Sequence, residues 1–74
     1  MKKAVITKTL KKVEEAKKEY SLGFARYFGL PSRVKSDLYL AYYLETGSTN
    51  GYDYVMNFLE SLTEYEFQCW MMAR

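Results

Sequence analysis

The side chains that could perform chemistry on a substrate are few in this chain. It contains no histidine and a single cysteine, Cys69, so it cannot assemble a nucleophile–histidine pair or a zinc site. Cys69 lies beside Trp70 in an apolar helical segment, where a thiol is far more often a packing residue than an activated nucleophile. We therefore expect no catalytic thiol and no bound metal.

Two further arrangements would support chemistry, and the sequence favours neither. Carboxylates in the second half of the chain could pair for acid–base hydrolysis, but their spacing is typical of the solvated faces of two amphipathic helices. These carboxylates are Asp53, Glu60, Glu64 and Glu66. Gly47 and Gly51 bracket a loop that lacks the Gly-Lys-Ser/Thr element of a phosphate cradle. The sequence predicts a protein that is not an enzyme and that has no cofactor.

The size and composition of the chain favour a binding protein. Its 74 residues suffice for a single domain, residues 1–74, with 49% hydrophobic and 18% aromatic residues. A chain this short buries only roughly 60% of the surface that its unfolded form exposes, and no disulfide or metal stabilises it. Association remains as the means of covering apolar surface, with a larger protein partner or as a homodimer.

Charge divides the chain into two halves. Residues 1–35 carry ten Lys or Arg against three Glu, a net +7, whereas residues 36–74 carry one Arg against six Asp or Glu, a net −5. The halves could simply attract each other, or the first could bind phosphate or an acidic partner surface. The apolar run that follows Lys2 and Lys3 is too short for a signal peptide, and no run approaches the ~20 residues of a membrane span. We expect a cytoplasmic protein with no membrane association.

Hydrophobic periodicity predicts an all-α fold, a compact bundle of three or four helices at about 3–28, 32–46, 51–62 and 64–73. Apolar residues at spacings of four and three favour one long first helix, with a break near residues 21–23 as the competing interpretation. The strongest local signal is Thr63 with Glu66, which predicts a capping box at the start of the last helix.

The segment 32–46 is the most informative helix because both of its faces are apolar. Ser32 is the expected N-cap and Gly47 the expected C-terminal stop. The aliphatic arc is the expected core side and consists of Val34, Leu38, Leu40, Ala41 and Leu44. The opposite arc includes three tyrosines. A small domain covers only one of these faces, so the tyrosine arc is a candidate docking surface.

The last helix also has two apolar sides. One stripe contains Phe67 and Trp70. The second contains Tyr65, Cys69 and Met72, and Met and Tyr side chains are common at binding surfaces. The residues that we expect to bind protein are therefore Tyr39, Tyr42, Tyr43, Tyr65, Cys69 and Met72. The same side chains could instead lie at the rim of the core.

Residues 24–38 resemble the helix-turn-helix of bacterial and phage repressors. The resemblance implies that Ala25 allows close helix approach, that Gly29 makes the turn, and that Leu30 and Leu38 are core residues. The repressor family buries an apolar residue of its recognition helix at the position that Lys35 occupies here, and Val34 lies one place earlier. The residues that would contact DNA are Ser32, Arg33, Lys35 and Ser36.

The leading hypothesis is a small non-catalytic interaction protein that binds and modulates or inhibits a larger protein through an aromatic helical surface. Its Lys-, Tyr- and Met-rich composition is typical of phage accessory proteins, although no motif carries that attribution. The alternative hypothesis is a DNA-binding regulator of the helix-turn-helix kind.

Overall fold

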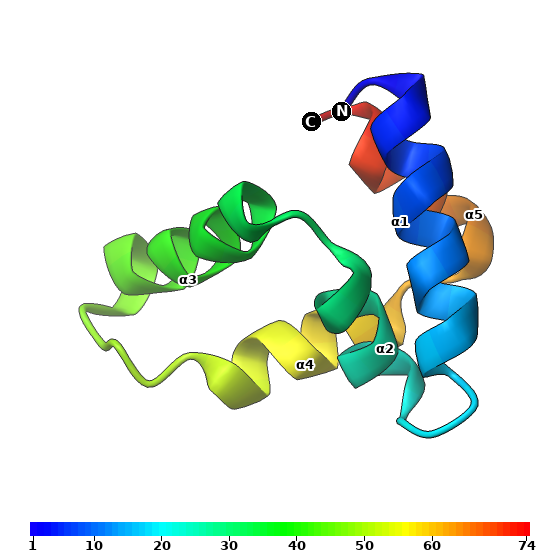
Figure 1. Ribbon diagram of the computed structural model, residues 1–74. Coiled ribbons are helices and arrows are strands. Elements are labelled where there is room, and N and C mark those ends of the chain that lie inside the picture. The colour runs from blue at the N-terminus through cyan, green and yellow to red at the C-terminus, as the bar shows by residue number, and fades with distance from the viewer.

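The computed structural model describes residues 1–74 and contains five α-helices and no strand (Figure 1). The helices are α1 (Lys3–Ala16), α2 (Leu22–Gly29), α3 (Ser32–Thr46), α4 (Tyr52–Ser61) and α5 (Glu64–Met72). The all-helical class is thus confirmed, with one helix more than the sequence predicted. No helix has the length and apolar character that crossing a membrane requires.

The prediction of a single helix over residues 3–28 is wrong. α1 ends at Ala16, a turn follows, and α2 begins after Ser21. The Ser21 hydroxyl accepts from the Phe24 N–H at 3.4 Å, and the Glu60 carboxylate accepts from the Gly23 N–H. These acceptors satisfy helix N-terminal donors that a continuous helix would not expose. The competing interpretation, a break at residues 21–23, places the start of the new helix correctly.

α2 lies between α1 and α4 and packs on both, as the arrangement in Figure 1 shows. Two glycines permit this close approach. A Cβ on Gly29 would lie 2.7 Å from the Val13 Cγ2, and a Cβ on Gly23 would lie 2.7 Å from the Met56 carbonyl oxygen. Gly29, which the helix-turn-helix resemblance assigns to the turn, is instead the last residue of α2 and does not have a positive φ. The only positive φ belongs to Gly47, at 74°, which ends α3 as expected.

Arg26 is the largest fully buried side chain, and it joins α2 to the junction between α4 and α5. Its Nη1 donates to the carbonyl oxygens of Leu59 at 2.7 Å and Leu62 at 2.6 Å. Its Nη2 lies 3.5 Å from a Glu64 oxygen, and the guanidinium stacks 4.7 Å from the centre of the Phe67 ring. The guanidinium therefore satisfies carbonyls that the end of α4 leaves without helical partners.

The predicted capping box at the start of α5 is confirmed. The Glu66 N–H donates to the Thr63 hydroxyl at 3.1 Å, and the Thr63 N–H donates to the Glu66 carboxylate at 2.9 Å. At α3, by contrast, Ser32 is the first helical residue, and Pro31 occupies the N-cap position without a side-chain bond.

The hydrophobic core is formed by ten buried side chains from all five helices and the α2–α3 link. These are Val13, Ala16, Ala25, Leu30, Val34, Leu38, Val55, Leu59, Phe67 and Met71. α3 contributes Val34 and Leu38 to this core, and its principal neighbour is α4. In Figure 1, α3 accordingly lies apart from α1 and α5, at the side of the molecule.

Candidate functional site

The sequence predicts that the aliphatic arc of α3 faces the core, but the structure buries only part of that arc. Val34 and Leu38 are buried as expected, but Leu40, Ala41 and Leu44, which belong to the same predicted arc, are exposed. The helix is rotated so that part of the aromatic arc turns inward. Its interior face is therefore mixed, and aliphatic side chains stay in contact with solvent.

Two of the predicted binding tyrosines attach α3 to its neighbours. Tyr39 is half-buried, with its ring edge-on to the Tyr27 ring of α2 at 6.1 Å. Tyr42 is half-buried against the Tyr54 ring of α4 at 4.8 Å. Both rings lie close to Gly51, where a Cβ would be 2.8 Å from the Tyr42 ring. Burial, and secondarily the Tyr27 hydroxyl, raise the pKa of Tyr39 to about 12. Tyr39 thus lies at the rim of the core, and Tyr42 attaches α3 to α4.

The third tyrosine belongs to an exposed apolar surface. Leu40, Tyr43 and Leu44, which we call the α3 outer face, are 53%, 47% and 74% exposed. Their spacing of three and four residues places them on one side of the helix. Asp37 and Glu45 lie on the same helix, exposed and without an ion pair. Sequence periodicity found both apolar arcs of α3 but assigned Leu40 and Leu44 to the core side, where they do not lie.

The predicted residues of α5 form a second, separate stripe. Tyr65 and Met72 are exposed, and Cys69 between them is half-buried. The Cys69 thiol raises the pKa of the Tyr65 hydroxyl above its ordinary value. Trp70 turns the other way and packs between the rings of Phe58 and Phe67. The six predicted residues therefore occupy three environments: the contacts of α3 with α2 and α4, the α3 outer face, and the α5 stripe.

The residues predicted to contact DNA lie in the first turns of α3. Ser32, Arg33 and Ser36 are exposed. Lys35 is half-buried, with its Nζ 5.1 Å from the centre of the Tyr27 ring and 5.9 Å from that of Phe28. Lys35 therefore covers aromatic rings of α2, in the place where the repressor family has an apolar residue.

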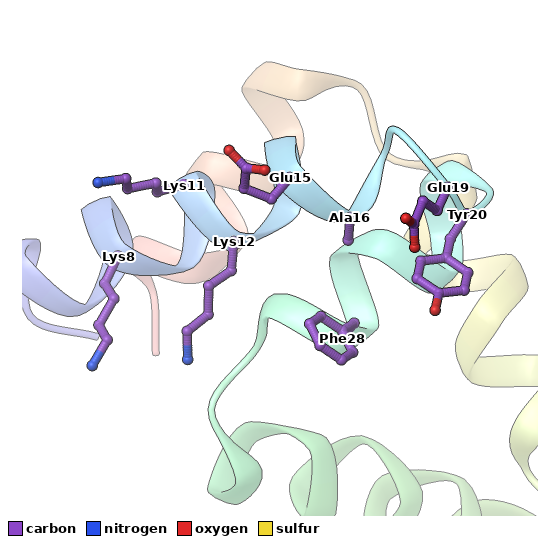
Figure 2. A pocket seen from close by; sticks show the side chains of 8 residues that line it. All are labelled: Lys8, Lys11, Lys12, Glu15, Ala16, Glu19, Tyr20 and Phe28. Carbon is purple, nitrogen blue, oxygen red and sulfur yellow. The ribbon is translucent and has the colours of Figure 1, made fainter.

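Sequence reasoning missed a groove between α1, the turn that follows it and the end of α2, which we call the α1–α2 groove. Its volume is about 620 Å³, and the side chains lining it are Lys8, Lys11, Lys12, Glu15, Ala16, Glu19, Tyr20 and Phe28 (Figure 2). The groove exists because the chain breaks after Ala16 and α2 folds back against α1. A single long helix would have kept Phe28 far from Lys8 and Lys12, so only the break signal could have revealed it.

Elsewhere, no three Cys, Asp or Glu side chains converge in a way that could hold a metal ion. The chain matches no protein-family model, and comparison with curated proteins and with solved structures gives no significant match.

Proposed function

We propose that the protein is a non-catalytic interaction module that docks the α3 outer face on a larger protein and thereby modulates or inhibits it. One observation supports this proposal. α3 is apolar on both sides, and the fold covers only the side that carries Val34 and Leu38. Large apolar side chains held on one face of a rigid helix are typical of helix-in-groove recognition.

The exposed leucines are large enough to dominate such a contact. Burying a fully exposed leucine contributes about 2 kcal/mol. Leu40 and Leu44 retain 53% and 74% of their exposure, so covering both contributes roughly 2.5 kcal/mol, or about 70-fold in affinity. The Tyr43 ring adds contact area with little loss of side-chain freedom.

A paired capture experiment tests the proposal. Tagged wild type and the double variant Leu40→Ser/Leu44→Ser are used to capture proteins from the lysate of the source cell, and each captured protein is quantified by mass spectrometry. The matched control is Tyr65→Ser/Met72→Ser, which changes two apolar residues on α5 that are 78% and 63% exposed. We expect a partner that the α3 variant loses and the α5 variant retains. Loss with the α5 variant alone would move the docking surface to α5.

The second candidate function is DNA binding, and the exposure of Ser32, Arg33 and Ser36 at the start of α3 favours it. If α3 is a recognition helix, mobility-shift binding falls steeply as salt rises and is abolished by Arg33→Ala/Lys35→Ala. Protein docking through the α3 outer face instead tolerates salt and survives that substitution. Retention of nucleic acid alone in the capture experiment would replace the first candidate by the second.

A further inference from the structure

Phe28 is an exposed aromatic ring of the α1–α2 groove, and lysines of two helices lie around it. Its side chain is 54% exposed. Lys8 and Lys12 line the same groove, and Figure 2 shows both side chains extending from α1 toward the side on which Phe28 lies. The Lys35 ammonium group of α3 lies 5.9 Å from the centre of the Phe28 ring. A flat ring surrounded by ammonium groups suits a ligand in which planar rings alternate with negative charges.

The groove lysines nearest to Phe28 have no carboxylate partner within the chain. The structure contains three ion pairs, and none of them involves Lys8 or Lys12. Of the two carboxylates in the lining, Glu15 is paired with Lys18, and Glu19 lies on the turn after α1. The groove is therefore basic at the end that holds Lys8 and acidic at the opposite end. An anionic ligand that extends beyond the groove must leave it at the basic end.

A second hollow continues the basic surface beyond that end. It has a volume of about 770 Å³, and its lining includes Lys2, Val5, Arg33 and Asp37. Val5 lies three residues before Lys8 on the same face of α1, so the two hollows follow each other along this helix. Neither Lys2 nor Arg33 takes part in an ion pair. Together the two hollows are lined by six Lys or Arg side chains and by three Asp or Glu side chains.

We propose that the two hollows bind a single-stranded nucleic acid, with a base stacked on Phe28 and neighbouring phosphates on Lys8 and Lys12. These two lysines are one helical turn apart, a rise of about 6 Å along α1. An acidic protein segment would meet the same lysines, but it would gain nothing specific from the flat face of the ring, whereas every base can stack on it. Bases paired within a duplex offer no free face to the ring, so the strand is unpaired.

The charges of the lining set the direction of the strand. From Phe28 it continues past Lys8 into the hollow that holds Lys2 and Arg33, and away from the carboxylates at the other end of the groove. This site gives a role to the net +7 of residues 1–35, which docking through the α3 outer face does not use. It goes beyond the proposed docking function, and either can fail without the other.

Fluorescence anisotropy with a labelled oligo-dT strand of about ten nucleotides tests the ring and the lysines separately. Phe28→Leu keeps an apolar side chain but removes the flat face, and it should weaken binding about fivefold or more without changing the salt dependence. Phe28→Tyr keeps the flat ring and should bind as wild type does. Lys8→Gln/Lys12→Gln should reduce the slope of log affinity against log salt by about 1.4, the value for two phosphate contacts to a single strand.

Matched controls separate the site from overall charge and from the α3 outer face. Lys3→Gln/Lys17→Gln removes the same charge from two residues that line neither hollow, and it should leave the salt slope as in wild type. Leu40→Ser/Leu44→Ser should bind the strand as wild type does. Circular dichroism checks that every variant is folded.

Four results would overturn the proposal. Wild type could fail to bind the strand at up to about 1 mM, or the control Lys3→Gln/Lys17→Gln could change the salt slope as much as the groove variant. Unchanged affinity of Phe28→Leu, together with competition by polyglutamate, would assign the hollows to an acidic protein surface instead. Tighter binding of a duplex than of the strand, lost on Arg33→Ala, would favour duplex recognition by α3.

Discussion

Arg26 offers the sharpest prediction about how this small fold is held together. The guanidinium is 2% exposed and donates to the carbonyls of Leu59 and Leu62, and its Nε has no hydrogen-bond partner. Arg26→Met keeps the length of the side chain but leaves both carbonyls without a donor. A buried unsatisfied polar group costs about 1–3 kcal/mol. We therefore expect Arg26→Met to lower the free energy of unfolding by about 3 kcal/mol. This is less than the largest cost for two unsatisfied carbonyls, because the substitution also removes Nε, which is buried without a partner.

This loss is large relative to the whole stability of the domain. A chain of 74 residues has a free energy of unfolding of roughly 4–11 kcal/mol at 0.05–0.15 kcal/mol per residue. The ion pair contributes little by comparison, because the Glu64 side chain is 57% exposed and the charged atoms are 3.5 Å apart. Glu64→Gln should cost less than about 1 kcal/mol. The contribution of Arg26 thus comes from capping α4 and only to a small extent from charge pairing.

Urea unfolding followed by far-UV circular dichroism measures both variants against wild type. We expect a clearly lower midpoint for Arg26→Met and a small shift for Glu64→Gln, with unchanged slopes. Equal destabilisation by Glu64→Gln and Arg26→Met would refute the role of Arg26 in capping α4. That role is also refuted if Arg26→Met is as stable as wild type, since the carbonyl bonds would then contribute nothing beyond the desolvation of the guanidinium.

Gly29→Ala should destabilise the fold by about 1–3 kcal/mol, because the new methyl would lie 2.7 Å from the Val13 side chain, and thermal unfolding would show it as a lower midpoint. Thr63→Ala removes the hydroxyl that accepts from Glu66 and should cost about 1 kcal/mol in urea unfolding; a neutral result would contradict the role of the capping box. The raised pKa of Tyr39, about 12, favours its neutral form in the folded state, so its contribution is complete below pH 10 and is lost between pH 10 and 12. Tyr39→Phe should accordingly gain stability relative to wild type over that interval, and a difference that does not change with pH would refute the assignment.

Local signals in the sequence predicted much of the fold because they depend on neighbouring residues only. The Thr63–Glu66 box and the stop at Gly47 are decided by bonds within a few residues, and both are present. The break between α1 and α2 depends in part on Glu60, which is distant in sequence and accepts from the Gly23 N–H. Hydrophobic periodicity within residues 3–28 carries no information about Glu60, so it favours one long helix over two.

The orientation of α3 shows why the candidate site was predicted only in part. Periodicity separates an aliphatic arc from an aromatic arc, but it does not decide which arc meets the core. Here the Tyr39 ring packs on Tyr27 and the Tyr42 ring packs on Tyr54. Gly51 has no side chain and therefore leaves room for both rings. Leu40 and Leu44 of the same helix are left exposed beside Tyr43, and these three residues form the α3 outer face that we propose as the docking surface.

The central claim is that the α3 outer face is a docking surface. Its most direct test is to measure the affinity of the captured partner for the purified chain and its variants. We expect the dissociation constant to rise about 70-fold for Leu40→Ser/Leu44→Ser, the value given by the exposed fractions of the two leucines. Tyr65→Ser/Met72→Ser should bind as wild type does. Equal affinities for wild type and the leucine variant would contradict the claim.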